Sequence, residues 1–213
     1  MFVTGGTGYV GRPLIGALLE RGHAVHALVR VGSESKLPPG VTQAVGDALQ
    51  ASSFAAAIPR GATVVHLVGT PHPSPSKAAE FRRVDLGSIL ATVTAAQLAA
   101  ARHLVYVSVA HPAPVMHAYV AAREEGEAAV RASGIPATIL QPWYVLGPGH
   151  RWPYLLVPLY ALWRVLPATR QGAARLGLVK RSAMVAALLE AVEAPPASGV
   201  RDLGVPEIRR AAR

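Results

Sequence analysis

Hydrophobic residues in this chain form short apolar runs that alternate with stretches of helical spacing. The apolar runs are Met1–Thr4, Ala24–Arg30, Thr42–Val45, Thr63–Val68, His103–Val107 and Ala137–Leu140, and the helical stretches are Val10–Arg21, Ala78–Ala101 and Ala118–Ser133. Short apolar runs are typical of strands buried on both faces. Strands that alternate with helices imply right-handed βαβ units. The pattern therefore predicts an α/β fold, a Rossmann-type doubly wound parallel sheet.

The chain changes character after Pro142. Aromatic residues crowd into the stretch that follows: Trp143, Tyr144, Trp152, Tyr154, Tyr160 and Trp163. A further helix is expected around Ser182–Val192 and a last strand at Val200–Val205. We expect one domain over residues 1–213, in which 148–213 forms a small C-terminal helical lobe.

Composition excludes several classes of protein. Of the 213 residues, 51% are hydrophobic and 15% are charged, which is enough apolar material for a full core. The absence of cysteine excludes a disulfide framework and a thiolate metal site, and the histidines show no metal signature. No apolar run reaches the ~18–20 residues that a membrane-spanning helix needs. Met1-Phe2-Val3 already has the pattern of a core strand, so we do not expect a signal peptide. We expect a cytoplasmic protein.

The net charge of +9 favours anionic partners such as phosphates. Basic residues are scattered along the chain from Arg12 to Arg213 and form no stripe interleaved with aromatics, so nucleic-acid binding is not expected. The apolar and aromatic segment 152–167 is flanked by Arg151, Arg164 and Arg170. We expect it to wall a substrate pocket or to form a subunit interface, and contact with a membrane surface is the alternative.

The strongest motif is the turn Thr4-Gly5-Gly6-Thr7-Gly8-Tyr9-Val10-Gly11, which follows a predicted strand and opens a predicted helix. Gly5 permits the tight turn, Gly8 lets the backbone approach a pyrophosphate, and Gly11 lets the helix pack closely on the sheet. The helix N-terminus offers unpaired N–H groups to phosphates. The turn therefore predicts a dinucleotide site that includes Gly5, Thr7, Gly8, Tyr9, Val10 and Gly11.

The end of the second strand bears on the choice of dinucleotide. An acid at this place would bind the ribose hydroxyl of NAD, whereas Arg30 can accommodate the 2′-phosphate of NADP. Glu34 offers a displaced acid for NAD. We favour NADPH as the cofactor, with NAD as the alternative. Asp47, which follows the third strand, either accepts a hydrogen bond from adenine or caps the next turn.

These residues, together with five later segments, resemble the short-chain dehydrogenase/reductase superfamily in its extended and atypical branches. The turn Thr4–Gly11 matches the TGxxGxxG form of that superfamily. The later segments are Val64–Gly69, Val84–Ser88, Val105–Ser108, Tyr119–Arg123 and Gln141–Gly149. The resemblance implies that Leu67, Val68, Gly69 and Pro142 also contact the cofactor.

The resemblance further implies a catalytic site in which Tyr119 is the general acid or base and Ser108 orients the substrate. Arg123 stands where the superfamily has a lysine that holds the ribose, and Gln141 stands where it has an arginine. From the residues alone, Tyr119 and Arg123 share one helix face, since they lie four positions apart. A cation beside a phenol favours the ionised phenol.

Two functions are consistent with these residues. One is an NADPH-dependent oxidoreductase acting on a small hydrophobic carbonyl or quinone-like substrate, with 148–213 on the substrate side of the NAD(P)-binding domain. The other is a non-catalytic NADPH-binding protein that senses redox state or supports an assembly, similar to the NmrA-like sensors or the accessory subunit of respiratory complex I. Intact Ser108 and Tyr119 favour the first, and Arg123 and Gln141 favour the second. The sequence does not indicate an oligomeric state.

Overall fold

The computed structural model of this chain describes residues 1–148, 172 and 175–211. Within them, seven parallel strands form one sheet in the order β3-β2-β1-β4-β5-β6-β9. The strands are β1 (Phe2–Thr4), β2 (His26–Val29), β3 (Thr42–Val45), β4 (Thr63–His66), β5 (His103–Val107), β6 (Ala137–Leu140) and β9 (Val200–Leu203). Strand β7 (Tyr144–Leu146) pairs with β8 (Leu178–Lys180) in a second, small parallel sheet. The doubly wound parallel fold is thereby confirmed.

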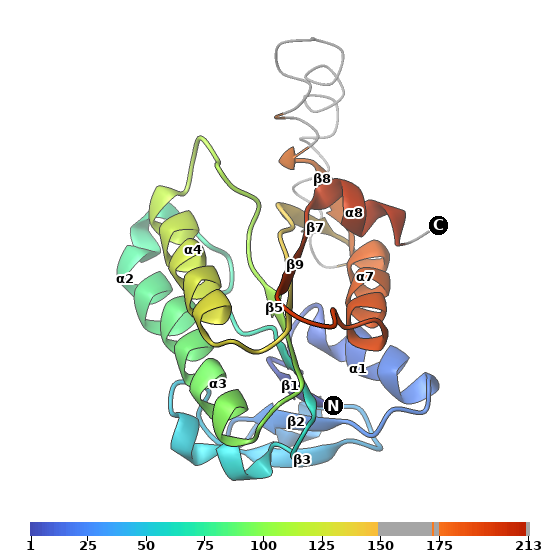
Figure 1. The fold of residues 1–213 in the computed structure, drawn as a ribbon. Helices are drawn as coiled ribbons and strands as arrows, with labels where there is room; N and C mark the ends of the chain where they lie inside the picture. Colours follow the sequence, from blue (N-terminus) through green and yellow to red (C-terminus); the bar gives the residue numbers. More distant parts are fainter. Residues whose placement is uncertain (149–171, 173–174, 212–213) are drawn as a thin grey trace.

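Helices cover both faces of the main sheet (Figure 1). The longer ones are α1 (Gly11–Glu20), α3 (Gly87–Leu98), α4 (His117–Ala132) and α7 (Arg181–Glu193). The shorter ones are α2 (Ala78–Glu80), the π-helical turn η5 (Phe81–Leu86), α8 (Val205–Arg210) and the 3-10 turns η1 (Glu34–Lys36), η2 (Ala51–Ser53), η3 (Ala55–Ala57) and η4 (Pro75–Lys77). Helices α1 and α7 lie on one face, and α3 and α4 lie on the other (Figure 1).

The strand residues divide between two cores because successive side chains of a strand point to opposite faces. Val3 and its neighbours in register, Val65 and Val105, pack against α1 and α7. Phe2, one residue earlier, belongs with Val64 and packs under α3 and α4. Both cores are almost inaccessible to solvent, so register is strongly specified at the centre of the sheet.

The sequence pattern locates most of these elements correctly. The strands expected at Thr42–Val45, His103–Val107 and Ala137–Leu140 have those bounds in the structure. The single helix expected over 78–101 is instead a succession of α2, η5 and α3 that ends at Leu98. The small sheet β7–β8 and helix α8 were not expected. Helix α8 begins where the last strand was expected to continue, because Pro206 in its first turn favours a helix start.

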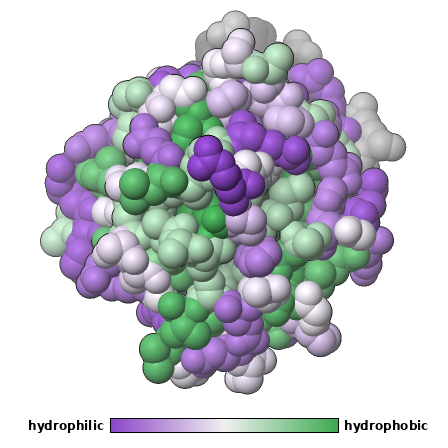
Figure 2. Space-filling view, turned by 60° about the horizontal axis from the view of Figure 1, so that its bottom comes forward, coloured by the Kyte–Doolittle hydropathy of each residue, from purple (hydrophilic) through white to green (hydrophobic). Residues whose placement is uncertain are grey.

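The described part of the C-terminal region is joined to the main sheet. Strand β9 pairs with β6 and extends the main sheet, and α7 packs against α1 on its face. The described part of 148–213 is therefore built into the sheet rather than resting beside it. The expectations for the segment 152–167 lie outside the described residues. On the face of the molecule in Figure 2, hydrophilic and hydrophobic side chains are interspersed.

Candidate functional site

The glycine turn connects β1 to α1 with no room for side chains at two positions. Gly5 has φ of 73°, and a Cβ there would lie 2.7 Å from the carbonyl carbon of Leu67. A Cβ on Gly11 would lie 2.3 Å from the carbonyl oxygen of Gly5. The Gly8 amide donates to that same oxygen at 3.0 Å, which closes the turn. The turn thus lies directly against the backbone that follows β4.

A cavity of about 690 Å³ opens beside this turn, where β1, β4 and β5 end. This volume lies in the usual range for ligand pockets. Many of the residues predicted from the sequence line the cavity: Gly5, Gly8, Tyr9, Val10, Gly11, Leu67, Val68, Gly69, Tyr119 and Arg123. Thr7, Arg30, Asp47, Ser108 and Pro142 are not among the lining residues. The structure therefore brings the glycine turn together with Tyr119 and Arg123.

Tyr119 and Arg123 lie on one face of α4, as their spacing predicts. The Arg123 guanidinium carbon is 5.3 Å from the centroid of the Tyr119 ring. Phe81 contacts the same ring edge-on, with centroids 5.0 Å apart. Within the described part of the chain, the Tyr119 hydroxyl has no hydrogen-bond partner, and the residue lines the cavity. Tyr119 thus forms part of the cavity wall.

Arg123 is held by a carboxylate that the sequence analysis did not single out. Its Nη2 donates to Asp85 Oδ1 at 2.5 Å and its Nη1 donates to the Val107 carbonyl at 2.9 Å. Burial opposes the charge of Arg123, but Tyr119, Tyr106 and Asp85 more than offset it and raise the pKa of Arg123 above its ordinary value. The guanidinium therefore remains charged inside the protein.

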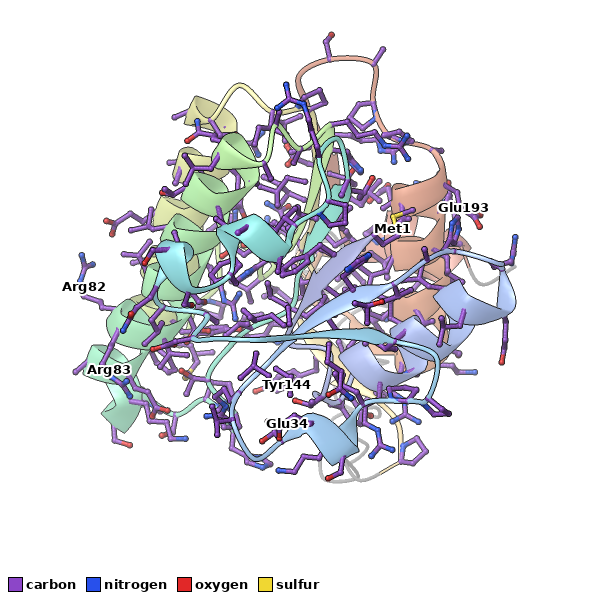
Figure 3. The ribbon with its side chains drawn as sticks, turned by 90° about the horizontal axis from the view of Figure 1, so that it is seen from below. Met1, Glu34, Arg82, Arg83, Tyr144 and Glu193 are labelled. Carbon is purple, nitrogen blue, oxygen red and sulfur yellow. The ribbon has the colours of Figure 1, made fainter. Side chains whose placement is uncertain are left out.

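Asp85 belongs to the π-helical turn η5 and is completely buried. Arg82 and Arg83, in the same turn, point away from the body of the protein (Figure 3). The available signal in the sequence was an acid between Val84 and Leu86, at the inward face of an apolar helical stretch. A buried acid needs a partner. That requirement would have singled out Asp85, although not its partner.

Ser108 is placed differently from Tyr119. Its side chain is buried, and its Oγ has no hydrogen-bond partner among the described residues. Val107 and Val109, on either side of it, line the cavity. This alternation follows from the two-residue period of an extended segment. The structure does not bring Ser108 to the cavity, so its catalytic role stays a prediction without geometric support.

The buried His66 is a satisfied core residue, as its position in an apolar strand predicts. Its Nδ1 lies 3.0 Å from Thr4 Oγ1 and 2.9 Å from Thr92 Oγ1. Burial, followed by the charge of Arg123, lowers the pKa of His66 to about 3. His66 is therefore neutral in the folded protein at ordinary pH.

The two residues predicted to select the cofactor lie at the ends of their strands. Arg30 follows β2 directly, is exposed, and makes no ion pair within the described residues. Asp47 follows β3, and its Oδ1 accepts a hydrogen bond from the Leu49 amide at 2.9 Å. Asp47 thus has the turn-capping contact that was one of its two expected roles. Arg12 and Lys36 are also exposed.

The small sheet borders the cavity on its remaining side. Trp143 and Tyr144 line the cavity, with their ring centroids 5.5 Å apart. Tyr144 is one of the residues labelled in the view from below (Figure 3). Arg181, at the start of α7, lies over the ring of Tyr9 at 4.8 Å. The C-terminal elements therefore contact the glycine turn as well as the sheet.

No group of three or more His, Asp or Glu side chains among the described residues could hold a metal ion. In the same part of the chain, no helix has both the length and the apolar character that crossing a membrane would require.

A glycine turn that joins the first strand to the first helix, and faces a cavity at the carboxyl ends of a parallel sheet, defines a dinucleotide-binding Rossmann domain. Residues 5–151 match the family model described as NAD(P)H-binding, and the chain belongs to that family. Solved structures from the short-chain dehydrogenase/reductase superfamily share the fold of this chain.

Two curated relatives are similar to this chain over 175 residues. The ceramide reductase of Caulobacter vibrioides is 32% identical, with 79% of this chain and 53% of the relative covered. The 3-diazoavenalumate denitrifying reductase of a Streptomyces species is 33% identical, with 70% of this chain and 57% of the relative covered. The chain spans a little over half the length of the curated relatives it matches.

Solved structures share the fold at lower identity. A short-chain dehydrogenase/reductase superfamily protein from Agrobacterium tumefaciens, solved with bound NAD, is 20% identical with a TM-score of 0.70, covering 95% of this chain and 76% of that one. A putative epimerase from Burkholderia cenocepacia is 23% identical with a TM-score of 0.69, covering 97% and 77%. These likenesses support the same arrangement of sheet and helices.

Proposed function

We propose that this protein is an NADPH-dependent reductase for a small hydrophobic carbonyl or quinone-like substrate. One observation carries the proposal: the glycine turn and Tyr119 line the same cavity, and the Tyr119 hydroxyl has no partner among the described residues. The cavity wall near Tyr119 includes Val109, Met116 and Trp143, which favours an apolar substrate. The names of both curated relatives, which describe reductases, support the same reaction class.

The residues present fit a dinucleotide. Gly8 lines the cavity without a side chain, and the turn around it leaves space for phosphates at the start of α1. The glycine turn would hold the dinucleotide, which when bound would supply a hydride for the carbonyl carbon of the substrate. Tyr119 donates its proton to the substrate oxygen and is reprotonated from solvent. Arg123 does not contact the substrate in this proposal, because Asp85 and the Val107 carbonyl hold its guanidinium.

Replacing Tyr119 by phenylalanine tests the proposed proton donor. A positioned donor contributes about 10²–10⁴-fold in rate, so we expect turnover to fall at least a hundredfold. NADPH affinity should stay unchanged, because the glycine turn is untouched. The measurement is NADPH oxidation with a panel of small hydrophobic aldehydes, ketones and quinones, together with calorimetric titration of NADPH. If the wild type binds NADPH but oxidises it with no member of the panel, the non-catalytic function replaces this proposal.

The choice of cofactor is a second test. We expect NADPH to bind more tightly than NADH, and Arg30→Ala to weaken NADPH binding by roughly one to two decades, since a charge-assisted hydrogen bond contributes about 1.5–3 kcal/mol. Arg60→Ala is the matched control, because Arg60 is also exposed but precedes β4 at the opposite end of the sheet. Equal affinities of wild type for the two cofactors, or an Arg30→Ala variant that binds NADPH as the wild type does, would contradict the assignment.

A further inference from the structure

The ion pair between Arg123 and Asp85 has almost no access to solvent. The two side chains are 6% and 0% exposed. Such a pair is costly to form and strongly destabilising to break, because removal of one partner leaves a charge buried without compensation. The pair lies beside the cavity, since Arg123 is one of the residues that line it.

Thr70 fixes the carboxylate from the other side. Its Oγ1 donates to Asp85 Oδ2 at 2.6 Å, and its amide lies 3.2 Å from the same oxygen. Gly69 gives the guanidinium its space, since a Cβ at Gly69 would lie 2.3 Å from Arg123 Nη2. The ion pair is thus held by three elements: the segment after β4, the turn η5 and helix α4. Arg123 cannot turn toward the cavity without breaking this set of contacts.

The surroundings of Arg123 and Tyr119 contain few other charges. The titratable groups that face them are Asp85 from η5, Tyr106 from β5, His66 from β4 and, next to Tyr106, Glu127 from α4. His66 is neutral, as its lowered pKa shows. Burial raises the pKa of Tyr106 above its ordinary value, so this phenol stays protonated. Asp85 is therefore the carboxylate that compensates Arg123.

We propose that Asp85 is a positioning residue that holds Arg123 beside Tyr119 and cancels its charge, so that the site acts as a proton donor for reduction. This inference rests on the proposed function. An uncompensated guanidinium 5.3 Å from the ring would favour the ionised phenol. With the carboxylate in place, the pair beside the Tyr119 ring carries no net charge.

The test is Asp85→Asn in the full chain, which keeps the shape of the side chain and removes its charge. We expect the alkaline midpoint of NADPH oxidation to move down by about 1–3 pH units. Tyrosinate absorbance, taken as the difference from the same protein with Tyr119→Phe, should move in the same direction without any substrate. Glu125→Gln is the matched control, because Glu125 is an exposed carboxylate on α4 that pairs with Arg82. It should move neither midpoint.

A second variant keeps the inference testable if Asp85→Asn does not fold. Asp85→Asn combined with Arg123→Gln removes both charges, and we expect its absorbance midpoint to match that of the wild type. A rise of more than about one pH unit in the double variant, or no shift in a folded Asp85→Asn protein, would overturn the inference. If the absorbance shifts as expected but no substrate is reduced, the inference about Asp85 stands and the proposed reductase function fails.

Discussion

Replacement of Gly11 by alanine should weaken NADPH binding by about a hundredfold or more and destabilise the fold by roughly 1–3 kcal/mol. The added Cβ would lie 2.3 Å from the carbonyl oxygen of Gly5 and 2.8 Å from the Cα of Gly6, both of which are backbone atoms. Backbone cannot rotate away as a flexible side chain can, so the turn must open. Opening it displaces the amides that face the phosphates. Calorimetric titration with NADPH and urea unfolding measure the two effects.

Gly16→Ala is the matched control, in the same helix. A Cβ at Gly16 meets nothing within 4 Å, and the residue lies in the interior of α1. There alanine only restricts the unfolded chain and improves helix propensity, so we expect a gain of roughly 0.5–1 kcal/mol. NADPH affinity should not change. A Gly11→Ala variant that binds NADPH like Gly16→Ala would show that the close approach of α1 to the turn does not matter for the cofactor.

Stability should fall steeply as the pH falls below about 6.5, because His66 is buried in its neutral form. The unfolded chain takes up a proton near pH 6.5, whereas the folded protein takes it up only near pH 3. Between these values the unfolded state binds more protons, so the unfolding free energy decreases by up to about 1.4 kcal/mol per pH unit. The difference amounts to about 4–5 kcal/mol over the whole window. His103 adds in the same direction, because burial, followed by Arg201 and Arg102, lowers its pKa to about 4.

The measurement is the unfolding free energy as a function of pH for wild type and His66→Gln. The variant should be less stable at neutral pH but lose stability more slowly below pH 6.5. His117→Gln is the control, because His117 is exposed at the start of α4. Parallel pH curves for wild type and His66→Gln would show that His66 takes up its proton at the same pH in the folded and the unfolded protein.

The fold was largely predictable, because most of its strands and helices can be recognised from the residue pattern within each element. Each central strand is an apolar run buried on both faces, and helices α1 and α4 each carry an apolar stripe, so the period of the pattern identifies them. The exception after Leu140 has a physical reason. Strand β7 is three residues long and pairs with β8, more than thirty residues later in the sequence. Such a pairing leaves no local signal that separates it from a loop.

The sequence predicted the parts of the candidate site that depend on a backbone turn or on the spacing of residues along one helix. The glycine turn and the pair Tyr119–Arg123 lie where spacing places them. The partner of Asp85 could not be assigned, because the contact with Arg123 joins residues 38 positions apart on different elements. Ser108 is a different case. Its position at the end of β5 was predicted correctly, but the side to which its hydroxyl points depends on the one-residue phase of the strand.

The pairing of β9 with β6 has a consequence for how the domain is delimited. The family match ends at residue 151, before β9 and α7. A fragment cut at that boundary would leave β6 as an unpaired edge and would uncover the apolar surface of α1 that α7 protects. Open strand edges and bare apolar faces promote aggregation. The sheet with its covering helices therefore extends beyond the family match, and its C-terminal part protects the edge of β6 and the apolar surface of α1.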